Sequence, residues 1–178
     1  MRKYFITTAR LGLSHWQPAD EPLALALWGD PSVSRYISVN GFTDEQVRAR
    51  LATEIENGEK HSIQYWPVFL KDTGEHIGCC RLRLLDVPPD AIGFGGYELG
   101  FHLRSAYWGK GYATEAARAV IAYAFGTLGL DCIYAGHHPA NAASAALLGK
   151  LGFIYLADML YPPTGLKHPV YCIKSNNT

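Results

Sequence analysis

Apolar and polar positions alternate most regularly between residues 97 and 103. The apolar positions are Tyr97, Leu99, Phe101 and Leu103. The intervening positions, which are polar or small, are Glu98, Gly100 and His102. Because successive side chains of a strand point to opposite faces, this period predicts a strand with one apolar face and one polar face.

Two apolar segments precede this strand. Residues 63–70 and 76–85 are rich in aliphatic and aromatic side chains, and the polar segment 71–75 between them indicates a β-hairpin. Segment 86–96 contains prolines and glycines and is predicted to be a loop. Its glycine-rich end, 93–96, comes before a strand rather than a helix, so we do not expect it to bind phosphate.

The first half of the chain also carries two helix signals. Residues 22–28 predict a short helix that ends before a Gly-Asp-Pro sequence. A second helix is expected to begin after Thr43, which has the spacing to Gln46 of a capping box. We expect this helix to end at Gly58.

The second half alternates between helix and strand. Apolar residues recur at helical spacing over 113–128, and an alanine-rich helix is predicted from Asn141 to Gly152. Shorter strand signals are found at 132–135, 153–159 and 170–174. The order of elements predicts a mixed α/β fold in one domain, 1–178.

Composition narrows the classes of function. Hydrophobic residues make up 48% of the 178 residues and charged residues 18%, which is typical of a folded domain. The formal net charge is zero and no basic stripe is present, so neither a nucleic-acid partner nor an anionic membrane is expected. Arg10 interrupts the apolar N-terminal stretch, which argues against a signal peptide, and a cytoplasmic protein is the expectation.

The residues that commonly bind metals do not form a ligand pattern. The four cysteines, Cys79, Cys80, Cys132 and Cys172, lack metal-ligand spacing, and we expect the adjacent pair to be buried free thiols. His137 and His138 are followed by no carboxylate or cysteine at ligand spacing. We therefore expect no metal.

The glycine-bearing turn from Trp108 to Ala113 joins the alternating strand to a helix. Backbone N–H groups at such a helix start can bind phosphate, and Gly111 lets a ligand approach closely. The spacing is neither that of a Walker loop nor that of a Rossmann fingerprint. A glycine needed only for tight packing would produce the same pattern.

Additional motifs identify a family. Residues 104–116 resemble the acetyl-coenzyme A pyrophosphate loop of the GNAT superfamily of N-acetyltransferases, with Gly111 and Ala113 on the last two positions of its Gln/Arg-x-x-Gly-x-Gly/Ala pattern. Trp108 replaces the Gln/Arg, as is common in the RimJ/RimL-like branch. Further segments that resemble this branch are 30–33, 74–78, 141–144 and 148–153.

The resemblance implies a fold and a cofactor. The GNAT fold has a central, mostly antiparallel, splayed sheet of about seven strands with about four flanking helices. Acetyl-CoA would lie where the strand at 97–103 separates from that at 132–135. The cofactor-binding residues implied are Phe101, Leu103, Trp108, Gly109, Lys110, Gly111, Tyr112, Ala113, Thr114, Asn141 and Ser144. An aspartate at position 111 is expected to weaken cofactor binding by charge repulsion.

The reaction implied is direct transfer of the acetyl group to a primary amine. Glu98 and His102 are the candidate bases, and Gly100 between them is expected to leave room for substrate. A carboxylate that is merely paired, or a histidine that is merely hydrogen-bonded, would fit the same pattern. Backbone N–H groups of the strand would polarise the thioester carbonyl.

The general acid is less clear from the sequence. The tyrosine that the family commonly uses is replaced by Leu148, and Ser144 is the candidate substitute, although it could simply pack on its helix. Asn141 could cap that helix, touch the cofactor, or do both.

Three properties stay open at this level. The acceptor could be a protein N-terminus or a small amine. Because Leu148 replaces the usual acid, a non-catalytic CoA-binding module with the same fold is a second interpretation. Many members of the family form homodimers, and the sequence leaves this open as well.

Overall fold

The computed structural model describes residues 2–85 and 96–175 and contains one eight-stranded sheet, ordered β1-β2-β3-β4-β5-β6-β8-β7. The strands are β1 (Ile6–Thr7), β2 (Leu11–Leu13), β3 (Tyr65–Leu70), β4 (His76–Leu85), β5 (Gly96–Leu103), β6 (Cys132–Gly136), β7 (Ile154–Tyr161) and β8 (Leu166–Lys174). Neighbouring strands are antiparallel except for β5 and β6.

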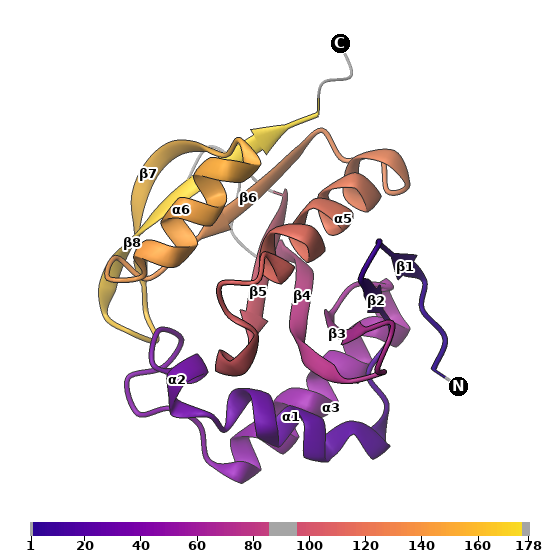
Figure 1. Cartoon of the computed structure of the whole chain (residues 1–178). Coiled ribbons are helices and arrows are strands. Elements are labelled where there is room, and N and C mark those ends of the chain that lie inside the picture. The colour runs from indigo at the N-terminus through magenta and orange to yellow at the C-terminus, as the bar shows by residue number, and fades with distance from the viewer. Residues whose placement is uncertain (1, 86–95, 176–178) are drawn as a thin grey trace.

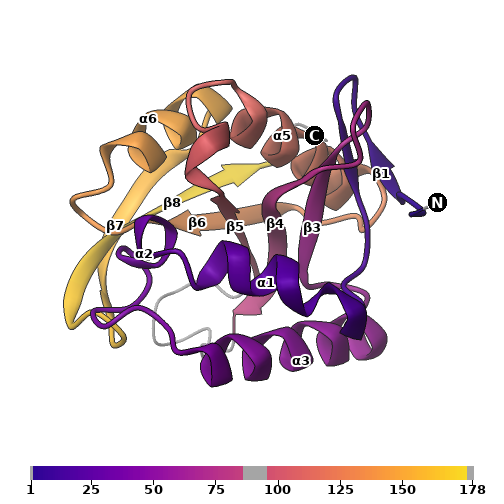
Figure 2. The ribbon, with the colours of Figure 1, turned by 60° about the horizontal axis from the view of Figure 1, so that its bottom comes forward.

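Helices cover both faces of the sheet, as Figures 1 and 2 show. They are η1 (Pro18–Asp20), α1 (Glu21–Trp28), α2 (Pro31–Ser34), α3 (Asp44–His61), η2 (Ser105–Tyr107), α5 (Tyr112–Gly126) and α6 (Ala142–Leu151). α1, α2 and α3 lie on one face, and α5 and α6 lie on the other. The predicted mixed α/β fold with a mostly antiparallel sheet is confirmed.

The sheet splays between β5 and β6. β4 pairs with β5 along its whole length, from Gly96 to Leu103. Within the described residues, β6 pairs with β5 only through Tyr97 opposite Ile133 and Glu98 opposite Tyr134. Beyond these two pairs, this edge of β5 has no partner strand among the described residues.

The alternation read from the sequence decides how β5 is buried. Leu99 and Leu103 join the main core together with the apolar stripe of α5. The opposite face of the sheet packs on a second core that includes Trp28, Tyr65 and Cys79. Burial of each large apolar side chain contributes roughly 1.5–3 kcal/mol to stability. A register shift of one residue would expose these side chains, so burial determines which face of β5 packs on which core.

The cysteine prediction is confirmed for the adjacent pair. Cys79 and Cys80 are both fully buried, and all four cysteines are free thiols. Burial raises the pKa of the Cys80 thiol to about 12 and that of Cys79 well above its usual value. Neither sulfur is a thiolate near neutral pH.

The start of α3 is as predicted from the sequence, and its end is not. The Thr43 capping box is present, with Gln46 N donating to Thr43 Oγ1 at 3.3 Å and Thr43 N donating to Gln46 Oε1 at 2.9 Å. The prediction that Gly58 ends this helix is wrong, because α3 continues to His61. A Cβ on Gly58 would collide with the side-chain amide of Gln64, so this glycine serves close packing rather than termination.

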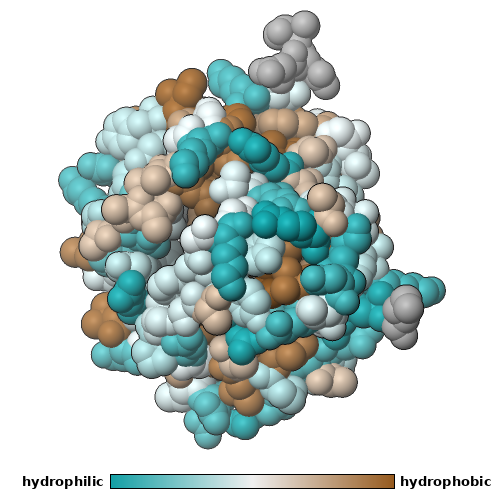
Figure 3. Space-filling model, in the orientation of Figure 1, coloured by the Kyte–Doolittle hydropathy of each residue, from teal (hydrophilic) through white to brown (hydrophobic). Residues whose placement is uncertain are grey.

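Other differences concern short or edge elements. The N-terminal hairpin of β1 and β2 and the one-turn α2 were not predicted, because such short segments show no period. β7 is an edge strand that exposes Ile154 and Leu160. On the face of the molecule that Figure 3 shows, hydrophobic and hydrophilic residues are interspersed. The loop predicted at 86–96 lies outside the described residues, except for Gly96, which begins β5. Every described helix is too short or too polar to cross a bilayer.

Candidate active site

A cavity of about 860 Å³ extends from the first turns of α5 and α6 to the polar face of β5. It lies at the splay between β5 and β6 and also reaches α2, β7 and β8. Its wall includes these residues predicted from the sequence: Glu98, Phe101, His102, Leu103, Trp108, Gly109, Gly111, Tyr112, Ala113, Thr114, Asn141 and Ser144. The predicted site residues, which are far apart in sequence, thus meet in one space.

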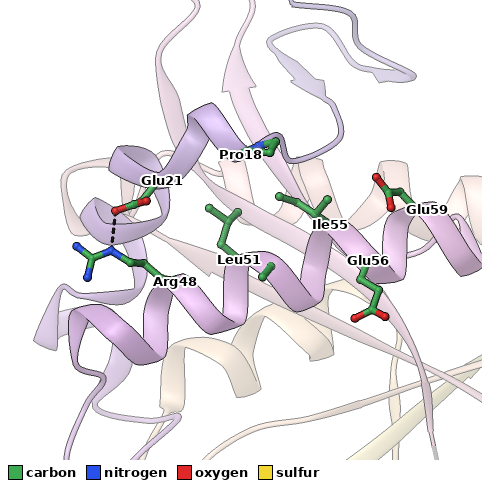
Figure 4. A pocket seen from close by; sticks show the side chains of 8 residues that line it. Pro18, Glu21, Arg48, Leu51, Ile55, Glu56 and Glu59 are labelled. Carbon is green, nitrogen blue, oxygen red and sulfur yellow. Dashed lines mark hydrogen bonds and ion pairs between the residues drawn. The ribbon is translucent and has the colours of Figure 1, made fainter.

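A smaller cavity of about 410 Å³ lies elsewhere, between the η1–α1 segment and α3 (Figure 4). Its wall contains the ion pair between Arg48 Nε and Glu21 Oε1, 2.7 Å apart, which joins α1 to α3. No residue predicted to act in chemistry is among the described residues that line it. Arg48 is consequently a suitable control position for substitutions in the large cavity.

The loop before α5 has the conformation that an anion site requires. Gly109 has φ 74° and Gly111 has φ 79°, both in the left-handed region that favours glycine. Gly111 is the N-cap of α5, and among the described residues no side chain caps the helix start. The first N–H groups of α5 thus lack helical acceptors and face a cavity, so the residues present fit the pyrophosphate of coenzyme A.

Two side chains of this loop, Trp108 and Lys110, make contacts within the protein. Trp108 Nε1 donates to the carbonyl of Leu103 at 2.8 Å, which ties the loop to the end of β5. Lys110 was predicted to bind cofactor, yet it lies outside the cavity wall, with its Nζ 5.4 Å from the centroid of the Tyr107 ring. The charge of its ammonium group is thus held at the rim of the loop.

The N-terminal hairpin holds this loop from behind. Arg10 Nε donates to Glu115 Oε2 at 2.7 Å, and Arg10 Nη1 donates to the carbonyl of Lys110 at 3.1 Å. Thr8 Oγ1 donates to Glu115 Oε1 at 2.5 Å. Partial burial raises the pKa of Glu115, but the hydrogen bonds from Thr8 and Arg10 outweigh it and lower the pKa overall. We call this contact the Arg10–Glu115 clamp.

The same geometry shows what a side chain at position 111 would meet. A Cβ at Gly111 would lie 3.6 Å from Nη2 of Arg10, so a side chain there faces the clamp. Because Gly111 also has a φ of 79° and lines the cavity, an aspartate at 111 would combine backbone strain, contact with Arg10 and charge near the proposed anion site. Ala113, in the first turn of α5, lines the cavity and offers a cleaner test of the charge of the site.

Loosening the clamp should weaken cofactor binding moderately. Glu115→Gln removes the charge that holds Arg10 against the loop, and we expect the Kd for coenzyme A to rise about fivefold, the effect of losing about 1 kcal/mol. Titration calorimetry with coenzyme A measures this. Arg48→Gln, which breaks the distant Arg48–Glu21 ion pair, should leave the Kd unchanged. Equal affinities for the Glu115 variant and the parent would remove the clamp from the account.

The first turn of α6 forms the opposite wall of the gap. Asn141 is its N-cap, and the side-chain Oδ1 accepts a hydrogen bond from Ser144 N at 3.1 Å. Both residues line the cavity, so capping and contact with a ligand are compatible here. Leu148 lies one turn further and is only 1% exposed within the main core. The leucine packs in the core and is not among the described residues that line the cavity.

The polar face of β5 is dominated by an ion-pair network. Arg81 Nη2 and Arg83 Nη2 both donate to Glu98 Oε2, at 2.5 Å and 2.9 Å. Gly100 lines the cavity, as expected of a residue that leaves room for substrate, but the space directly beside its Cα is filled. A Cβ there would lie 2.8 Å from Arg81 Nε and 2.9 Å from the hydroxyl of Tyr65, so these groups already occupy the space.

His102 lies beside the same groups, and its ring is enclosed by aromatic side chains. Trp28 Nε1, which can only donate, lies 3.2 Å from His102 Nδ1, so Nδ1 accepts and its lone pair is engaged. The Tyr65 ring stacks on the imidazole with centroids 4.7 Å apart. Burial, and then repulsion by Arg50 and Arg81, lower the pKa of His102 well below its usual value. The ring is therefore neutral at physiological pH.

Comparison with known proteins decides the family. A family model described as "Acetyltransferase (GNAT) domain" matches residues 10–154. The chain belongs to this family. It is 32% identical over 147 residues to the protein named "Uncharacterized N-acetyltransferase p20" of Bacillus licheniformis, covering 82% of this chain and 80% of that protein.

Solved structures agree with this GNAT assignment. An acetyltransferase from Agrobacterium tumefaciens is 27% identical, with a TM-score of 0.75 and coverage of 98% of this chain and 99% of that one. RimL, a ribosomal L7/L12 alpha-N-protein acetyltransferase solved with coenzyme A, has a TM-score of 0.79 over 99% of this chain and 100% of its own. At 14% identity RimL shows a shared fold. The chain is accordingly an acetyl-CoA-dependent GNAT acetyltransferase with the RimL fold.

Several residues of this GNAT site escaped the reading of the sequence. Arg81 and Arg83 alternate along β4. In the antiparallel register Arg81 is opposite Gly100 and Arg83 is opposite Glu98. Tyr65 comes from β3, one strand further away. The alternation of Arg81 and Arg83 was visible in the sequence, but the register that brings them to Glu98 was not.

Proposed function

We propose that this GNAT protein acetylates a primary amine by direct attack on the thioester, without a covalent enzyme intermediate. The observation that carries the proposal is the continuity of the cavity. One space joins the glycine loop at Gly109–Gly111 to the polar face of β5 at Glu98. A cofactor bound along the loop and the open edge of β5 would point its acyl end toward that face. The acceptor is a protein N-terminal α-amine or a small-molecule amine.

The chain's own residues divide the work. Acetyl-CoA supplies an activated thioester. The N–H groups at the start of α5 would hold its pyrophosphate, and Phe101 and Leu103 would pair their backbone with the pantetheine. Free N–H groups on the open edge of β5 would polarise the carbonyl. Each of these contacts relies on backbone that the fold already holds in place.

Glu98 is the better placed base. It lines the cavity as a carboxylate positioned by two guanidinium groups, and it would take the proton that the amine loses during attack. His102 also lines the cavity, but its Nδ1 already accepts from Trp28. We therefore assign uptake of the amine proton to Glu98. His102 has a positioning role, in which it supports Tyr65 and Trp28.

Ser144 is the proposed acid that returns a proton to the departing sulfur. It lies in the cavity wall on the first turn of α6, facing the gap in the sheet. Cysteine chemistry has no support, because the described cavity wall contains none of the four cysteines. Both points favour direct attack by the amine.

A non-catalytic CoA-binding module is the second candidate. It is favoured by Leu148, a buried apolar side chain at the position of the family's usual acid. The module would bind coenzyme A through the same loop and would leave the ion-pair network without a chemical role. Homodimerisation is compatible with either candidate.

An amine panel separates the two. With acetyl-CoA and a set of amino acids, N-terminal peptides, polyamines and aminoglycosides, we expect thiol release that depends on one class of amine. Intact-mass spectrometry should show no acetylated protein during turnover. Tight binding of coenzyme A without thiol release across the whole panel would favour the module.

A further inference from the structure

We propose that the acceptor amine carries a carboxylate or phosphate group, which Arg35, Arg81 and Arg83 recognise. This inference rests on the proposed amine acetylation and names its substrate class. The shared chemistry is an anionic group close to a primary amine, and it could belong to an amino-acid-like small molecule or to an acidic peptide N-terminus.

These arginines line the part of the cavity that the cofactor residues leave free. Cofactor-binding residues come from α5, α6 and the apolar face of β5. Arg81 and Arg83 lie on β4, and Arg35 is the residue that ends α2. Figure 2 shows α2 on the face of the sheet opposite α5 and α6. An acceptor would therefore reach Glu98 from the side of α2.

Aromatic rings enclose this end of the cavity. Tyr36 lies 5.2 Å from His138, which lies 5.3 Å from His168, and Tyr161 lies 4.7 Å from His168, as measured between ring centroids. All four side chains line the cavity. They connect α2 to the β6–α6 loop and to the β7–β8 hairpin, so the end that receives the acceptor is bounded on several sides.

The charge of this enclosure is positive. Among the described residues that line the cavity, Glu98 is the one acidic side chain, against Arg35, Arg81, Arg83 and Lys150. Glu98 can balance one of the two arginines that bind it, and Arg35 contacts the ring of Tyr36, with its guanidinium carbon 4.7 Å from the ring centroid. An excess of guanidinium charge remains, and guanidinium groups bind carboxylate and phosphate in a bidentate manner.

Arg81 adds a specific unsatisfied donor. Its Nε is buried and has no hydrogen-bond partner among the residues that the structure describes. Its Nη2 is already engaged by Glu98, and its guanidinium carbon lies 4.2 Å from the centroid of the Tyr65 ring. A buried donor without an acceptor is unfavourable, and Arg81 lines the cavity, so a shift of its side chain toward an anionic oxygen there would give this donor a partner.

The same charge favours the chemistry of an anionic acceptor. A polyamine would be repelled by the arginines, whereas an amine with a carboxylate would be attracted to them. Nearby positive charge also lowers the pKa of a bound amine, which for the α-amino group of a peptide is about 7.7–8.0 in water. The neutral, nucleophilic form is thus more populated in this enclosure than in solution.

Matched acceptors test the proposal. The panel pairs amino acids with their amides and O-phosphoethanolamine with ethanolamine, and adds spermidine and acidic against neutral N-terminal peptides. We expect kcat/KM to be at least about tenfold higher for the anionic member of a pair, the scale of one charge-assisted contact. Preference among the small pairs assigns a small acceptor, and preference confined to the peptides assigns a protein N-terminus.

Substitutions locate the preference. In Arg35→Gln and Arg83→Gln, both at exposed side chains, the ratio of kcat/KM within a pair should fall toward one, while Arg48→Gln keeps the parental ratio. Preference for neutral amines or spermidine, or a ratio unaffected by both arginine substitutions, would overturn the proposal. Absence of turnover with every amine would instead reject the proposed acetylation itself, so the two failures are distinguishable.

Discussion

Ala113→Asp is expected to weaken the binding of coenzyme A about a hundredfold, or roughly 3 kcal/mol. Ala113 lines the cavity in the first turn of α5, where the helix start would hold the pyrophosphate. A carboxylate there adds a negative charge close to the negative ligand. Titration calorimetry with coenzyme A measures the change.

The substitution separates charge from folding. An acidic residue in the first turn of a helix stabilises the helix, so the Asp variant should melt no lower than the parent protein. Ala113→Asn provides a neutral side chain of the same shape and should retain most of the affinity. If the Asp and Asn variants bind coenzyme A equally well, the pyrophosphate does not lie at this helix start.

Glu98→Gln is expected to lower kcat about a hundredfold, at the lower end of what general base catalysis supplies. Glutamine keeps the shape and one acceptor oxygen for Arg81 and Arg83 but cannot take up a proton at neutral pH. The affinity for coenzyme A should stay within about twofold of the parental value, because the base acts on the amine. Steady-state kinetics with a saturating amine, together with calorimetry, measure both quantities.

A structural role for Glu98 would give a different result. The carboxylate also compensates the partly buried Arg81, so its loss could disturb the enclosure without removing a base. In that case Arg83→Gln, which removes one partner of Glu98 at an exposed position, should lower kcat as strongly as Glu98→Gln does. A kcat unchanged in Glu98→Gln would remove Glu98 from the chemistry.

Much of the fold could be predicted because its signals are local. The alternation around Leu99 and Leu103, the capping box at Thr43 and the N-cap at Asn141 all depend on neighbours within a few residues. Gly58 shows the limit of such signals. The residue type that ends a helix also permits close approach, and only the position of Gln64 decides between the two.

The site was predictable in part for the same reason. The motif that contains Gly111 predicted the loop before α5, and the alternation along β5 predicted that Glu98 lies on its polar face. The Arg10–Glu115 clamp joins residues 105 positions apart, and no local pattern could pair them. The contact of Arg81 with Gly100 likewise depends on strand register, so the sequence suggested open space where the fold places a guanidinium group.

The fate of the acetyl group distinguishes direct transfer to the amine from transfer through the protein. The protein is mixed with acetyl-CoA labelled with deuterium in its acetyl group and with the preferred amine, and the label is followed by mass spectrometry in the protein and in the amine. Direct transfer predicts labelled N-acetylated amine in equal amount to the coenzyme A released, with no label on the protein at any time. Label that appears first on the protein, or coenzyme A binding without labelled amine, would contradict it.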